Sequence, residues 1–133
     1  MGQNTTDSLK GLSVLIFLSE GVKMAVDTEQ IEGIIELEQA AEKQATLMDI
    51  HGSPFHYKGG LGDLRVLLVK DEVISCGIVV EGLQEITFIN IESIKLLPSL
   101  IESSRRLKTI WGVFMKDADM IFLADLTILL RNK

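Results

Sequence analysis

The stretch TIWGVFMKDADMIFLADLTILL, residues 109–130, decides how the fold of this 133-residue chain is predicted. It contains three apolar runs, and the polar tetrapeptide KDAD (116–119) separates the first from the second. One continuous helix would spread the KDAD charges around its circumference in mid-element, whereas a β-hairpin places them at its tip, in water. We therefore expect a hairpin, followed by a short helix over 126–130 for which Asp125 supplies the N-terminal cap.

Short apolar runs rich in Val, Ile and Phe recur along the rest of the chain, at the roughly 8–12-residue spacing typical of barrels and sandwiches. The runs at 13–18 and 22–26 flank Glu20 and Gly21, a turn signal, because glycine takes the positive φ of a tight hairpin. Residues 38–45, EQAAEKQA, are polar and Ala-rich, and we expect a connector or a helical turn there. The pattern predicts an all-β fold of about nine or ten short strands with a small C-terminal helix.

The composition excludes several classes of partner. With 47% hydrophobic and 24% charged residues the chain is expected to be globular, as a single domain over 11–133 after a flexible N-terminal tail at 1–10. The net charge of −6 repels phosphate, so nucleic acid is not expected as a partner, and the acidic balance suits a cytoplasmic protein. The longest apolar runs, such as VLIFL and LTILL, are far shorter than the ~20 residues that cross a bilayer. We therefore expect no membrane insertion.

Catalytic and cofactor motifs are missing from the sequence. It has no GxSxG nucleophile elbow, and KGGLG (58–62) is neither a phosphate loop nor a dinucleotide fingerprint. His51 and His56 could share a metal ion, but zinc sites need three or four ligands and no cysteine lies near them in sequence. We expect no enzyme activity, no cofactor and no metal. Trp111 is left open between core packing and a surface anchor for a partner protein.

Four stretches carry a family resemblance when they are taken in order. They are VLIFLSEGVKMAVDTEQIEGIIEL (14–37), LMDIHG (47–52), RVLLVKDEVISCGIVVEGLQEITFINIESIKLLP (65–98) and the opening stretch at 109–130. LMDIHG resembles a strand end of the form xNLRG, and CGIVVEGLQEI resembles the pattern hGIVVDxVxxV, where h is apolar. The ordered set resembles the CheW-like domain family, which comprises the chemotaxis coupling proteins and the related regulatory domain of the histidine kinase CheA.

This resemblance implies a fold and a function. The fold would be two intertwined five-stranded SH3-like barrels packed around a shared hydrophobic core. The protein would be a non-enzymatic, cytoplasmic coupling or adaptor protein of a chemotaxis or chemosensory-type signal transduction pathway. It would link a CheA-like histidine kinase to the cytoplasmic tip of a chemoreceptor. Ile31 and Ile34 would contact the kinase, and His51 and Gly52 would lie near the barrel junction, where contacts converge.

Three departures from the family pattern keep alternatives open. His51 stands where the family has an arginine, Asp49 where it has an asparagine, and Gly33 where it has an acidic residue. These changes cluster in the half of the domain that would contact kinase and receptor. One alternative is a diverged CheW-like module that has lost kinase coupling and binds another protein or forms a homodimer through exposed edge strands. Another is a ligand-binding or catalytic β-barrel, which would need a deep pocket gathering His51, His56 and acidic groups.

Overall fold

The computed structural model describes residues 10–55, 63–71, 75–96 and 109–131. The strands are β1 (Gly11–Ser19), β2 (Val22–Asp27), β3 (Ile31–Ile35), β4 (Thr46–Met48), β5 (Arg65–Val69), β6 (Cys76–Val80), β7 (Gly82–Asn90), β8 (Lys95–Leu96), β9 (Ile110–Lys116) and β10 (Asp119–Ala124). The helices are α2 (Leu37–Glu42), α4 (Leu126–Arg131) and the 3-10 turns η1 (Thr28–Gln30) and η2 (Ile91–Ser93). The predicted flexible tail lies outside the described residues except for Lys10.

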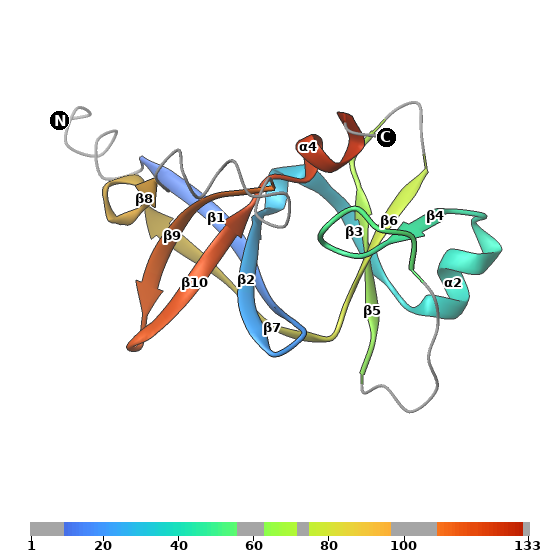
Figure 1. Cartoon of the computed structure of the whole chain (residues 1–133), viewed down its shortest axis with the longest axis horizontal. Coiled ribbons are helices and arrows are strands. Elements are labelled where there is room, and N and C mark those ends of the chain that lie inside the picture. The colour runs from blue at the N-terminus through green and yellow to red at the C-terminus, as the bar shows by residue number, and fades with distance from the viewer. Residues whose placement is uncertain (1–9, 56–62, 72–74, 97–108, 132–133) are drawn as a thin grey trace, which may run out of the picture.

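The strands form two sheets. The chain begins in one sheet, continues into the other and then returns to the first. A six-stranded sheet has the order β7-β1-β2-β10-β9-β8, and a four-stranded sheet has the order β3-β5-β6-β4. Figure 1 shows the sheets side by side, with α4 lying between their upper ends. Because β3 to β6 are inserted between β2 and β7, the two halves are intertwined. The predicted all-β fold with a short C-terminal helix is confirmed, and the strands divide six and four in the hydrogen-bonded sheets.

The hairpin predicted from KDAD is confirmed as β9 and β10, with Lys116 paired to Asp119 and Met115 to Met120. Its two-residue turn consists of Asp117 at φ 53° and Ala118 at φ 70°. Two positive φ angles define the type I′ turn, whose twist matches that of the flanking strands. The final helix is also confirmed, because Asp125 Oδ1 accepts a hydrogen bond of 3.0 Å from the Thr127 amide.

Strand β1 is buried on both faces, and this divides the core. Val14 and Ile16 face the inside of the six-stranded sheet, whereas Leu15 and Phe17 face the four-stranded sheet. Since successive side chains of a strand point to opposite sides, the continuous apolar run of β1 serves two cores. We call the first the six-strand core and the second the shared core. Trp111 is partly buried against the six-strand core, so part of its side chain serves packing and part remains exposed.

The shared core joins both sheets to α4. Its buried members are Leu15, Phe17, Met24, Val26, Met48, Ile50, Leu67, Val69, Cys76, Ile78, Val80, Ile110, Ala124, Leu126 and Leu129. On the other face of the four-stranded sheet, α2 covers a smaller cluster of Ala40, Val66, Leu68 and Val79. Strands β5 and β6 therefore have two buried faces, like β1, which explains why their sequences are continuously apolar.

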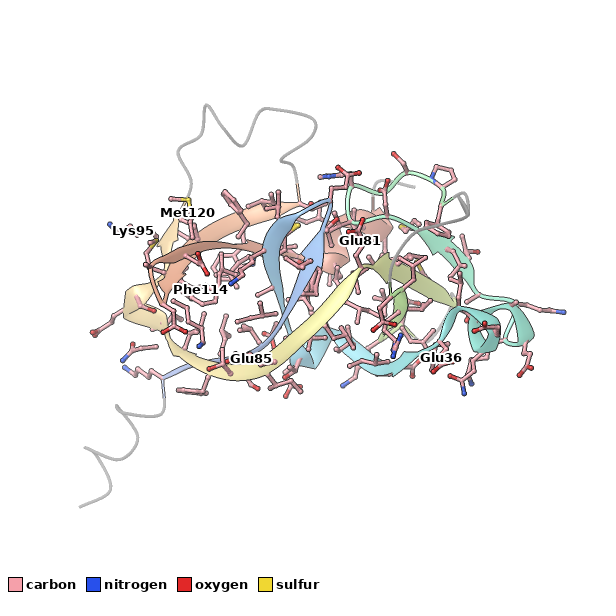
Figure 2. The ribbon with its side chains drawn as sticks, turned by 90° about the horizontal axis from the view of Figure 1, so that it is seen from below. Glu36, Glu81, Glu85, Lys95, Phe114 and Met120 are labelled. Atoms are coloured by element: carbon pink, nitrogen blue, oxygen red, sulfur yellow. The ribbon has the colours of Figure 1, made fainter. Side chains whose placement is uncertain are left out.

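The six-stranded sheet curves until strands that are far apart in the sheet meet. Lys116 of β9 and Glu85 of β7 form an ion pair of 3.3 Å between Nζ and Oε2, although β1, β2 and β10 lie between these strands. Phe114 points into the space that the curve encloses and is buried in the six-strand core (Figure 2). The sheet is therefore barrel-like, and this ion pair joins two strands that are not hydrogen-bonded to each other.

Of the two alternatives left open for residues 38–45, a connector or a helical turn, the helical one is confirmed. Leu37–Glu42 form α2, whose first turn is closed by a capping box between Glu36 and Gln39. The next strand, β4, ends at Met48, because a turn begins at Asp49. Beyond this turn, Pro54 forms an isolated bridge with Met48.

The β9–β10 turn gives a first prediction. Ala118 has a left-handed backbone conformation, which costs a residue with a Cβ roughly 1–2 kcal/mol. Ala118→Gly should therefore stabilise the chain by about 1 kcal/mol, measured as a higher urea midpoint at unchanged slope. Ala41→Gly, within α2, is the matched control and should destabilise by about 1 kcal/mol. A loss of stability in Ala118→Gly would contradict the type I′ turn.

The ion pair between Lys116 of β9 and Glu85 of β7 gives a second prediction. Hydrogen bonds to Asp117 and then to Glu85 raise the pKa of the Lys116 ammonium above its ordinary value of 10.5. A pKa that is higher in the folded state adds stability that is complete below pH 10.5 and is lost as the pH rises through the folded-state value. The urea midpoint of the parent chain should exceed that of Lys116→Met at pH 8, and the difference should shrink at pH 11. Lys43→Met, at an exposed position after α2, is the control; an equal difference for Lys116→Met at both pH values would refute the role of the pair.

Candidate protein-binding surface

Ile31 and Ile34 lie on β3, an edge strand of the four-stranded sheet. Asp27 caps the preceding turn η1 by accepting a hydrogen bond of 2.9 Å from the Glu29 amide, which turns the chain from β2 into β3. Ile31 pairs with Val69 and is partly buried against the shared core, so much of its side chain serves packing. Ile34 is 39% exposed and is the residue of this pair that a partner can reach.

Gly33 lies where β3 departs from regular pairing. The register of β3 against β5 shifts between Ile31 and Gly33, which marks a bulge. A Cβ on Gly33 would meet no atom within 4 Å. The position is therefore open to solvent and would accept the acidic side chain that the resembled family carries there.

His51 and Gly52 lie in a tight turn that Asp49 closes. Asp49 Oδ1 accepts hydrogen bonds from the amides of His51 at 2.9 Å and Ser53 at 3.0 Å, and the Asp49 carbonyl accepts one from the Gly52 amide at 3.0 Å. His51 is exposed, whereas Gly52 has a φ of 89° and faces α4. A Cβ on Gly52 would lie 3.2 Å from Leu129 Cδ2. Asp49 thus has a structural role here, since its carboxylate performs the capping that an asparagine amide oxygen also performs.

The four predicted contact residues do not form one cluster. Ile31 and Ile34 lie on β3 at one edge of the four-stranded sheet, while His51 and Gly52 follow β4 at the opposite edge. Strands β5 and β6 separate the two pairs. Both pairs adjoin the shared core, through Ile31 on one side and Ile50 on the other.

The sequence analysis did not predict that several apolar side chains would be exposed. Ile86 and Phe88 of β7 are 61% and 54% exposed, and Val22, Met115 and Met120 are exposed on the strands around the β9–β10 hairpin. In the sequence they look like core positions, because an alternating strand has the same pattern whether its apolar face is covered or bare. Only the sheet order shows that β7 is an edge strand. These residues extend the apolar surface available to a partner.

The described residues offer little for catalysis. Within them, no group of three or more His, Cys, Asp and Glu side chains is arranged to hold a metal ion. Cys76 is buried in the shared core, and His51 is exposed on its turn, so His51 does not lie in an enclosed pocket. His56 lies outside the described residues. The part of the chain that is described contains no helix long and apolar enough to cross a membrane.

The geometry defines an intertwined double-barrel domain with an exposed edge strand and an exposed turn. A solved structure of this class is the scaffolding protein TtCheW from Thermoanaerobacter tengcongensis, to which this chain is similar with a TM-score of 0.67. The similarity covers 90% of this chain and 92% of TtCheW at 16% sequence identity. No family model matches the chain, and no curated protein matches it by sequence. The likeness shows a shared fold, and it agrees with the fold that the resemblance implied.

Proposed function

We propose that the chain is a non-enzymatic CheW-like adaptor that links a CheA-type histidine kinase to chemoreceptors in a chemosensory-type pathway of the cytoplasm. The observation that carries the proposal is the fold, which matches a protein described as a scaffold over nine-tenths of both chains. The edge strand β3 adds a surface of the right kind, because within the described residues only one of its sides is paired with another strand, and Ile34 is exposed beside it. His51 and Gly52 would contribute the second contact, at the other edge of the same sheet.

This arrangement suits a scaffold with two partners better than an enzyme. Each contact segment is small, and a protein–protein interface of modest size typically has an apolar centre surrounded by polar groups. Ile34 provides such a centre, with the exposed side chains of Glu32 and Glu36 beside it. Because β5 and β6 separate the two edges, one partner can occupy the β3 edge while another occupies the turn at Asp49–Ser53.

The kinase contact gives a third prediction. Ile34→Ser should weaken binding to a CheA regulatory domain by about tenfold, because a buried aliphatic anchor contributes roughly 1.4 kcal/mol or more at an interface. Folding should change little, since the side chain is already 39% exposed. Val22→Ser is the matched control, because Val22 is 44% exposed but lies on β2 in the other sheet. Isothermal titration measures both variants, and equal affinities would refute the β3 contact.

The residues that depart from the family pattern give a fourth prediction. Restoring the family residues with Gly33→Glu and His51→Arg should fit the structure, because Gly33 has open space and His51 is exposed. If the chain is a retuned adaptor, the double variant should bind the CheA regulatory domain more tightly than the parent chain, and His51→Ala should bind more weakly. If none of these variants, nor the parent chain, binds, kinase coupling has been lost.

One observation favours a second candidate function, a module that binds another protein or itself. Ile86 and Phe88 form an exposed apolar row on the edge strand β7, and edge strands pair readily with other chains. Size-exclusion chromatography with light scattering, with and without a CheA regulatory domain, separates the two functions. A complex with the kinase domain supports the adaptor, whereas a homodimer without such a complex supports self-association.

A further inference from the structure

We infer that helix α4 is a clamp that couples the β3 edge to the His51–Gly52 turn, and that Gln30 is the positioning residue that holds the clamp in place. The two segments are those to which the proposed function assigns partner contacts, and only that assignment rests on the proposed function. The coupling itself follows from hydrogen bonds and packing between the described residues.

Gln30 holds the start of α4 with both ends of its carboxamide. Its Nε2 donates to Asp125 Oδ1 at 2.9 Å, and its Oε1 accepts from the Leu126 amide at 2.9 Å. Its backbone carbonyl accepts from the Lys70 amide at 2.9 Å, just after β5. Gln30 immediately precedes Ile31, the first residue of β3. The side chain of Gln30 therefore links the start of β3 to the first turn of α4.

The other side of α4 holds the turn at the opposite edge. Leu129 is buried in the shared core and its Cδ2 lies against Gly52, where a Cβ would approach within 3.2 Å. A second route runs through Thr109, whose carbonyl accepts from the Asp125 amide at 2.7 Å. The Thr109 hydroxyl in turn donates to the Ile50 carbonyl at 3.4 Å, in a buried position. Displacing α4 would thus remove two supports of the turn.

The length of α4 makes it suited to this role. Helices shorter than ~12 residues are marginal on their own, so the six residues of α4 persist because they are docked. Leu126 and Leu129 supply the apolar part of that docking, and Gln30 the polar part. A short docked element opens locally more easily than the whole protein unfolds. A partner that binds one edge and stabilises the docked position of α4 therefore also stabilises the conformation of the other edge.

Hydrogen exchange of the intact chain, resolved by residue, tests the clamp without any partner. In Gln30→Ala, the amides of α4 and those of Gly52 and Ser53 should exchange about tenfold faster, because two hydrogen bonds are lost. The amides of β1 and β2 should change far less. Gln39→Ala is the matched control, since it removes one side-chain to backbone hydrogen bond at α2, and it should leave α4 and the turn unchanged.

A reversed pair separates the clamp from a general loss of stability. Gln30→Glu alone places a carboxylate against Asp125 and should open α4 at least as much as Gln30→Ala. Adding Asp125→Asn supplies a donor, Nδ2, for the new carboxylate, while its Oδ1 can still accept from the Thr127 amide as the cap of α4. This double variant should return exchange at α4 and at the turn to within about threefold of the parent chain. This rescue remains informative even if Gln30→Ala fails to fold.

The inference is overturned if Gln30→Ala accelerates exchange uniformly, if α4 opens while Gly52 and Ser53 keep their protection, or if the reversed pair gives no rescue. Kinase binding is then measured separately on the same variants. A chain that shows the coupled opening but binds no CheA regulatory domain keeps the clamp and loses the proposed function. A chain that binds the CheA regulatory domain but lacks the coupled opening supports the proposed function and refutes the clamp.

Discussion

The two-sided burial of β1 is the constraint on which the rest of the structure depends. Four consecutive side chains of β1, Val14 to Phe17, are buried, and they alternate between the six-strand core and the shared core. A strand with two apolar faces is stable only when both are covered. One cover is the curved remainder of its own sheet, and the other is the four-stranded sheet with α4. The two sheets are therefore expected to fold as one unit, because separating them would expose the shared core to water.

This constraint also determines which surfaces remain available. Because the inner faces of both sheets are used for packing, partners are left with edge strands, turns and the margins of the apolar faces. The exposed side chains on these surfaces include Ile34 on β3 and His51 on its turn, together with Ile86 and Phe88 on β7. Among the described residues, these exposed side chains lie on separate strands and turns and do not form one continuous surface. Helix α4 lies between the sheets (Figure 1) and connects two of these surfaces.

Local chemistry made part of this architecture predictable. The KDAD turn, the Asp125 cap and the Glu20-Gly21 turn each depend on neighbouring residues, and each was recovered from the sequence. The division of strands into six and four was not, because it depends on long-range pairings such as that of β8 with β9. The exposure of Ile86 was missed for the same reason, since only the topology makes β7 an edge. Ile31 and His51 were named from a resemblance, which could not show that they lie on opposite edges of one sheet.

We propose that this intertwined domain offers its β3 edge and its Asp49–Ser53 turn to a kinase regulatory domain and a receptor. The most direct measurement is the backbone amide NMR spectrum of the whole chain during titration with a CheA regulatory domain. If this proposal is correct, saturable shifts will be concentrated on β3, with smaller shifts carried through α4 to the turn, and the β9–β10 hairpin tip will be unchanged. Shifts confined to β7 or to the hairpin tip, or no shifts at any concentration, would contradict it.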